Sequence, residues 1–272
     1  MRRSLLRHTL AWVSGAICIG LLQACATSQP SISSRIDALL PADIILFGEQ
    51  HDAPQHHVLE RALVLGLTRR GQLAALALEM AEKGRSTATL ARDASETAVQ
   101  TALQWDASGW NWSDYGPVVM AAVRGGVPVL GANLPRADMR AAMVEATLDN
   151  QLGADSLAQQ RDNIRSGHCF LLPESQIAPM TRIQIARDAA MAKTLVAAVR
   201  PGKTVLLVAG GGHVLRNLGV PQHLPSTLHT KVVLAVAGEA ASGTAASVDA
   251  VWSTPPVPPV DHCAELRKSM TR

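Results

Sequence analysis

The chain has 272 residues, in which 25 lysines and arginines stand against 22 aspartates and glutamates and give a formal net charge of +3. Three of the basic residues, Arg2, Arg3 and Arg7, lie at the very N-terminus, and without them the basic and acidic counts are both 22. A near-neutral chain lacks the excess positive charge that marks proteins which bind nucleic acid. We therefore expect no nucleic-acid partner, and the length is sufficient for one sizeable domain.

The N-terminal segment has the order of features found in a secretion signal. Its arginines precede an uncharged, mostly apolar stretch from Leu10 to Leu22, and the small residue Ala24 stands directly before Cys25. The apolar stretch is short for a membrane-spanning helix. The four residues that end at Cys25 resemble the lipobox of bacterial lipoproteins, which implies a signal peptide over residues 1–24, a palmitate-bearing Cys25 and an outer-membrane anchor. The alternatives are an uncleaved anchor and an ordinary signal peptide.

Two cysteines remain for the rest of the chain, because Cys18 leaves with the signal and Cys25 carries the lipid. These are Cys169 and Cys263. In an oxidising compartment a pair of cysteines commonly closes a disulfide. We therefore predict a disulfide between Cys169 and Cys263; the alternative is two buried free thiols.

Short apolar runs alternate along the chain with segments of helical periodicity. A continuous apolar run of about four to eight residues is typical of a strand that is buried on both faces. Strands that alternate with helices indicate an α/β fold with a mainly parallel central sheet flanked by helices. The predicted strands are 42–47, 73–78, 127–131, 204–209, 231–237 and 248–252, and the predicted helices are 54–70, 114–124, 136–148 and 175–199.

The same patterns suggest a simple domain organisation. Residues 25–41 are expected to form a tether and residues 42–272 a single domain, in which the proline-rich stretch 253–259 is extended. Residues 138–173 are more than a simple crossover between consecutive strands needs. We therefore expect a small helical lid subdomain over about residues 136–200.

Polar residues gather where three of the predicted strands end. The first strand leads into Glu49 and His51, the second into Glu79, and the fourth into three glycines followed by His213. In an open parallel sheet, the carboxyl ends of the strands form the crevice that binds ligands. Carboxylates and imidazoles are common metal ligands and common acid–base groups. The four residues are therefore candidates for one functional site; the alternative is a hydrogen-bonded cluster that only organises loops.

Aromatic residues are scarce, yet they are concentrated in one segment. Only seven follow the signal segment, and four of these lie between Trp105 and Tyr115. A flat hydrophobic ligand such as a porphyrin would explain this concentration, since a tyrosinate can bind ferric iron directly. His168 lies in the predicted lid and would face such a ligand, whereas His56 and His57 are expected to face solvent. The alternative is that the tryptophans pack a corner of the core.

Several of these motifs occur in the order found in a known family. The sequence resembles the ChaN-like haem-binding uptake lipoproteins, whose superfamily also includes erythromycin esterases and the Tiki proteases. The resemblance extends from about residue 42 to residue 252. It rests on Ile-Leu-Phe-Gly-Glu-Gln-His-Asp at 45–52, Glu-Met at 79–80, Trp-Asn-Trp-Ser-Asp-Tyr at 110–115 and Gly-Gly-His-Val at 211–214.

The resemblance implies an iron-regulated, outer-membrane protein that binds ferric haem for haem and iron uptake. It also implies a homodimer on haem binding, and an outer-membrane haem or iron receptor as a further partner. In such proteins a tyrosine supplies the iron ligand, and Tyr115 is the only tyrosine of this chain. A histidine assists it, for which we expect His168, while Trp110 and Trp112 are expected to wall the porphyrin.

The enzymatic members of the superfamily imply a second function. By that resemblance Glu49, His51, Glu79 and His213 would form the site of a metal-dependent hydrolase that acts on esters or peptides. The chain has no Gly-x-Ser-x-Gly motif, so water activated by a carboxylate or a divalent metal would be the nucleophile. A third hypothesis is a structural lipoprotein whose polar cluster only orders loops.

Overall fold

The computed structural model of the chain describes residues 30–241, 243 and 247–270. The predicted signal peptide over residues 1–24 and the predicted lipidation site at Cys25 lie outside the described residues. The stretch Ser31–Arg272 forms one compact unit. Among the described helices, none combines the length and the apolar character that crossing a membrane requires.

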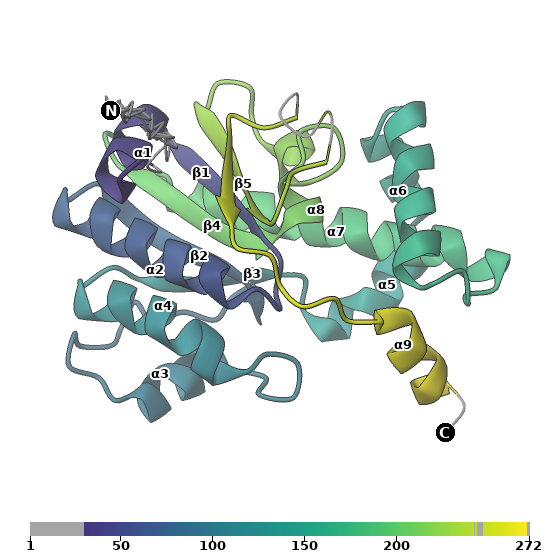
Figure 1. Ribbon diagram of the computed structural model, residues 1–272, viewed down its shortest axis with the longest axis horizontal. Coiled ribbons are helices and arrows are strands. Elements are labelled where there is room, and N and C mark those ends of the chain that lie inside the picture. The colour runs from purple at the N-terminus through teal and green to yellow at the C-terminus, as the bar shows by residue number, and fades with distance from the viewer. Residues whose placement is uncertain (1–29, 242, 244–246, 271–272) are drawn as a thin grey trace, which may run out of the picture. The chain divides into compact units, whose positions relative to one another are not determined.

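A single sheet of six strands runs through this unit, and every neighbouring pair of strands is parallel (Figure 1). The strand order is β3-β2-β4-β1-β5-β6. All six predicted strands are present, with their ends displaced by a few residues, and the α/β fold with a mainly parallel sheet is confirmed. The strands are β1 (Ile44–Glu49), β2 (Leu73–Glu82), β3 (Val129–Asn133), β4 (Thr204–Gly210), β5 (Thr230–Ala237) and β6 (Ala250–Thr254).

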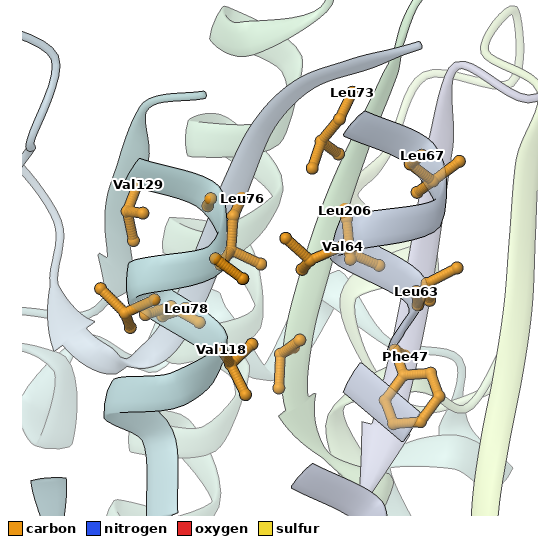
Figure 2. Packing of buried hydrophobic residues seen from close by; sticks show 14 of the residues in the cluster. Phe47, Leu63, Val64, Leu67, Leu73, Leu76, Leu78, Val118, Val129 and Leu206 are labelled. Atoms are coloured by element: carbon orange, nitrogen blue, oxygen red, sulfur yellow. The ribbon is translucent and has the colours of Figure 1, made fainter. Parts of the chain in front are cut away.

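Three helices pack on one face of the sheet, namely α1 (Ile32–Leu39), α2 (Pro54–Arg69) and α4 (Trp112–Arg124). Successive side chains of a strand point to opposite faces, so alternate strand residues turn toward these helices. Figure 2 shows Phe47 and Leu78 from the strands in one apolar cluster with Leu63 of α2 and Val118 of α4. The predicted helices that begin near residues 54 and 114 are therefore confirmed, and their apolar stripes face the sheet.

The opposite face is covered by α7 (Glu174–Ala198), α8 (Gly211–Val214) and η3 (Val220–His223). Met191 and Leu195 of α7 pack against Ile44, Leu46 and Leu207 of the strands. Because both faces of the central strands are buried, their sequences are continuous apolar runs.

Several of the described helices are absent from the sequence prediction, among them α1, α3 (Glu96–Leu103), α8 and α9 (His262–Met270). The predicted tether over residues 25–41 is wrong for Ile32–Leu39. Ser31 caps α1 by accepting a hydrogen bond from the backbone N–H of Ser34, and Ile36 is fully buried in the core. A helix this short depends on tertiary packing, which leaves little periodicity in the sequence.

The helix predicted over 136–148 is replaced by three shorter ones. The chain leaves helical geometry at Glu145, whose carboxylate accepts a hydrogen bond from the backbone N–H of Thr147. These helices and α6 (Ala154–Gly167) have a small apolar core of their own, in which Leu148 and Leu152 contact Ile185 of α7. The helices in this segment are η1 (Arg136–Asp138), α5 (Met139–Val144), η2 (Ala146–Gln151) and α6 (Ala154–Gly167).

The predicted disulfide between Cys169 and Cys263 is present, with the two Cα atoms 5.6 Å apart. Cys169 lies just beyond the end of α6, and Cys263 lies in α9. The bond therefore fixes the C-terminal helix to the helical segment, across a sequence separation of 94.

Candidate functional site

The four candidate residues of the strand ends lie together in the structure. Glu49 is the last residue of β1 and is in register with Gly210, the last residue of β4. Glu79 lies on β2, on the other side of β4, and its Oε2 accepts a hydrogen bond of 2.8 Å from the backbone N–H of Gly210. His51 lies two residues beyond the end of β1, and His213 lies in α8 just after β4.

Glu79 lies within its strand and not after it, which corrects the sequence prediction. The predicted strand ends at Leu78, but β2 continues to Glu82, with an irregular register against β3 between these two residues. Glu79 is only 3% exposed. Buried carboxylates are rare, so a glutamate after an apolar run is normally taken to mark the end of a buried strand.

Glu79, His213 and Asp188 form a buried group that we call the His213 cluster. His213 Nε2 lies 3.3 Å from Glu79 Oε1, and His213 Nδ1 donates to Asp188 Oδ1 at 2.6 Å. Burial alone would lower the pKa of His213, but the charges of Glu79 and Asp188 raise this pKa to about 10. Burial alone would raise the pKa of Glu79, but the charge of His213 lowers it to about 2. At neutral pH His213 is therefore an imidazolium between carboxylates.

His51 connects this group to Glu49 and to the solvent. Its Nδ1 lies 2.8 Å from Glu49 Oε1, and its Nε2 lies 3.9 Å from Glu79 Oε2. The side chain of His51 is 38% exposed, whereas the side chain of Glu49 is completely buried. Burial would lower the pKa of His51, but the hydrogen bond with Glu49 and the charge of Glu79 raise it. His51 is thus the residue of the site that a ligand or a water molecule can reach.

Glu49, His57 and Glu60 form a second buried group, the Glu49 cluster. The Tyr115 hydroxyl donates to Glu49 Oε1 at 2.7 Å, while Glu49 Oε2 lies 3.2 Å from His57 Nε2. Burial would raise the pKa of Glu49, but hydrogen bonding by His51 outweighs it and lowers this pKa. Burial and the charge of Glu49 raise the pKa of Glu60 well above its ordinary value. One ligand atom from each of the three residues lies within 4.8 Å of the others, an arrangement that can hold a metal ion.

Sequence reasoning missed several members of these two groups. His56 and His57 were expected to face solvent, but His56 is fully buried and accepts a hydrogen bond from the backbone N–H of Gln50 at 2.9 Å. The side chain of His57 is only 10% exposed. A signal was present, since His57 and Glu60 are three residues apart in α2 and share one face of the helix. Asp188 has no histidine or carboxylate three or four residues away in α7, so the sequence offers no such pair there.

A cleft of about 640 Å³ opens over the exposed side of the site, a volume typical of small-molecule sites. Loops after β1 and β4 line it together with residues of α6 and α7, and His168 and His262 lie at it as well. Arg187 also lines the cleft, and its Nε has no hydrogen-bond partner among the described residues. No serine or cysteine occurs in the described lining, so the cleft offers neither nucleophile.

Tyr115 is part of the core and does not face a ligand site. Its ring is 2% exposed and lies 5.9 Å from the ring of Trp105, measured between centroids. Burial and the charge of Glu49 raise the pKa of Tyr115 above its ordinary value, so the phenol keeps its proton. The predicted role of Tyr115 as iron ligand needs an accessible tyrosinate, and this structure provides none.

Trp110 and Trp112, the predicted walls of a porphyrin site, lie in different surroundings. Trp110 packs edge-on against His51, with 4.8 Å between ring centroids. Trp112 donates its Nε1 hydrogen to Glu96 at 2.8 Å and lines a separate groove beside α2 and α4. Both rings are partly buried against the core, and their role as walls of a porphyrin site stays a prediction.

His168 lies at the end of α6, at the cleft. Its Nδ1 lies 2.8 Å from the backbone oxygen of Ile164 and donates to it, while Nε2 has no partner among the described residues. The next two residues, Cys169 and Phe170, adopt left-handed φ angles of 57° and 58°. The chain turns sharply there, and the Phe170 side chain is left 76% exposed.

Comparison with known proteins identifies the family. Residues 35–224 match the family described as haem-binding uptake, Tiki superfamily, ChaN. The chain belongs to this family. The structure of cofacial haem binding to ChaN of Campylobacter jejuni matches with a TM-score of 0.67 and 28% identity, over 78% of this chain and 88% of that one. The type III effector HopBA1 matches with a TM-score of 0.43 and 15% identity, over 79% and 88%. A search among curated proteins finds no match.

Membership of the ChaN family raises the question of which residues fit a haem. A haem iron needs an axial ligand, and Tyr115 cannot reach a haem in this structure because it is buried. His168 fits, because a histidine that ligates a metal typically donates its other ring N–H to a carbonyl or carboxylate. Arg187 fits a propionate, since a guanidinium pairs with carboxylates through its planar fork.

Proposed function

We propose that this chain binds ferric haem at the mouth of the cleft and takes part in haem uptake. The observation that carries the proposal is His168, with its Nδ1 tied to Ile164 and its Nε2 directed to no protein partner among the described residues. The match to a haem-binding family supports it. The haem supplies the iron, and the chain's own residues bind, orient and shield it.

The turn after α6 presents His168 together with an aromatic ring. Two backbone hydrogen bonds close the turn, from Cys169 N to Ser166 O at 2.9 Å and from Phe170 N to Arg165 O at 2.8 Å. The disulfide at Cys169 anchors it to α9. Phe170 would cover part of a porphyrin face, which explains why this chain exposes one of its two phenylalanines.

A second copy of the chain is the proposed partner in the haem-bound state. Haem binding in ChaN of Campylobacter jejuni is cofacial. Two haems that face one another need two binding sites brought together. An exposed aromatic side chain beside the proposed iron ligand, as at Phe170, is the kind of surface that a homodimer buries.

The proposed location is the bacterial outer membrane. The signal peptide over residues 1–24 would direct export, and lipid at Cys25 would anchor the protein, under iron regulation and close to a haem or iron receptor. The Cys169–Cys263 disulfide supports an oxidising compartment, because such bonds persist mainly outside the cytoplasm.

A haemin titration of the purified protein tests this function. We expect saturable binding of about one haem per chain with a Soret shift and a change in assembly state on size exclusion. His168→Ala should weaken binding at least about tenfold, which corresponds to about 1.4 kcal/mol. Tyr115→Phe should leave the spectrum of the complex unchanged, because its hydroxyl is bound to Glu49.

Two results would contradict the proposal. If His168→Ala binds haemin like the wild type and Tyr115→Phe loses the spectrum, the iron ligand is Tyr115. If haemin does not saturate and the protein hydrolyses esters or peptides, the water-activating hydrolase with His51 in the cleft replaces haem binding.

A further inference from the structure

The Glu49 cluster holds four buried polar atoms that lack a hydrogen-bond partner among the described residues. They are Glu49 Oε2, His57 Nε2 and both carboxylate oxygens of Glu60. Glu60 is completely buried, and Glu49 is 4% exposed. Buried polar atoms in folded proteins are nearly always paired, because an unpaired one keeps the full cost of its lost hydration. A group of four such atoms therefore points to a ligand.

The spacing of these atoms fits a shared cation. Glu49 Oε2 and His57 Nε2 lie 3.2 Å apart, but their geometry is not that of a hydrogen bond. Two ligand atoms that bind one cation at about 2.0–2.2 Å each are separated by about 3.3–3.6 Å at a tetrahedral angle, and by slightly less at a smaller angle. One carboxylate oxygen of Glu60 lies within 4.8 Å of a ligand atom of Glu49 and of one of His57, so the three residues can supply ligands to one cation.

The charges of the cluster leave two candidates for the missing partner. Two carboxylates this close in a buried space need either a shared proton or a cation between them. One proton can bridge one oxygen of Glu49 and one of Glu60, but it leaves the second oxygen of Glu60 without a partner. His57 Nε2 then has only its contact of 3.2 Å with Glu49 Oε2. A divalent cation contacts both carboxylates and the imidazole at once and balances both negative charges.

We propose that Glu49, His57 and Glu60 form a binding site for a first-row divalent cation such as Zn²⁺ or Mn²⁺. Mixed imidazole and carboxylate ligands suit this class of ion. The cation would join α2 to the end of β1, and the partly exposed edge of His57 gives it a path of entry. The site is distinct from the haem site at His168 and from His213, whose two ring nitrogens already face Asp188 and Glu79.

A metal titration of the chelator-treated protein tests the proposal. We expect one Co²⁺ per chain, with the visible absorption of coordinated cobalt and displacement by Zn²⁺. Glu60→Gln should weaken binding at least about 100-fold, since even residues that only support metal ligands cost 10–100-fold. The glutamine keeps the size of Glu60 and can donate to Glu49. His57→Gln, nearer to the surface, should give the same loss and keeps the test available if Glu60→Gln does not fold.

His229→Gln is the matched control, because His229 is exposed and lies outside both clusters. It should retain cobalt affinity within about threefold, and haemin binding by Glu60→Gln should equal that of the wild type. The proposal is overturned if no stoichiometric metal binds, or if Glu60→Gln and His57→Gln bind like the wild type. It is also overturned if His51→Gln loses the metal while Glu60→Gln keeps it, which would place the ion at the strand ends.

Discussion

The His213 cluster and the Glu49 cluster contain the same residue types, one histidine and two carboxylates, and both lie where the strands of the sheet end. In the His213 cluster each ring nitrogen faces a carboxylate, and a backbone N–H donates to Glu79. Among the described residues, Asp188 Oδ2 is the one atom there that is fully buried and has no hydrogen-bond partner. In the Glu49 cluster the ring nitrogen and three carboxylate oxygens are left without one. Whether a buried polar group is structural or binds a ligand thus depends on how donors and acceptors match, more than on composition.

The two clusters also join different helices to the sheet. Asp188 comes from α7 and approaches from one face, whereas His57 and Glu60 come from α2 on the other. The His213 cluster is complete in the protein alone, so it should contribute to folding under all conditions. The Glu49 cluster should contribute fully only when its ligand is bound.

Breaking the His213 cluster should have the largest effect on stability. His213→Gln removes the positive charge and leaves Glu79 and Asp188 buried without it, which should cost about 3–5 kcal/mol of unfolding free energy. Urea unfolding at pH 7 measures this loss. His51→Gln, a change at a half-exposed histidine, is the control and should cost less than about 1 kcal/mol. A loss below about 1 kcal/mol in His213→Gln would show that the His213 cluster does not stabilise the fold.

The same cluster predicts how stability depends on pH. His213 has a pKa raised from 6.5 to about 10, so its contribution is complete below pH 6.5 and is lost as the pH rises toward 10. Glu79 has a pKa lowered from 4.5 to about 2, so its contribution is complete above pH 4.5 and is lost as the pH falls toward 2. Asp188, whose pKa burial raises to about 6, opposes Glu79, because stability falls between pH 3.8 and 6 as it ionises.

Between pH 6.5 and 9.5 the wild type should therefore lose about 2–4 kcal/mol. Urea midpoints at the two pH values measure the loss, and His213→Gln should show a much flatter profile over this range. A wild-type midpoint that stays constant up to pH 9.5 would mean that His213 is not charged in the folded protein.

The difference between the clusters also explains what the sequence could reveal. The strands were predictable because their apolar runs are local, and the meeting of Glu49, His51, Glu79 and His213 followed from parallel strands ending at one edge. The contact of Asp188 with His213 was not predictable, because Asp188 lies on a helix and no local pattern shows which strand end that helix packs against.

The burial of individual side chains was the property that the sequence predicted least well. Tyr115 looked available to a ligand because it stands among tryptophans, but the packing of α4 on the sheet encloses it. His57 looked exposed because it begins a helix next to a polar turn. In both residues the outcome depends on how α2 and α4 pack together, which no local pattern contains.

Changing the Glu49 cluster should have the smallest effect when no metal is present. Glu60→Gln replaces a buried carboxyl with a neutral amide of the same shape, so its unfolding free energy should stay within about 1 kcal/mol of the wild type. Zinc at about 100 times its dissociation constant should stabilise the wild type by about 2.7 kcal/mol and leave the variant unchanged. Thermal unfolding with and without Zn²⁺ measures both. If zinc stabilised the two proteins equally, the ion would bind without Glu60, and the Glu49 cluster would not be its site.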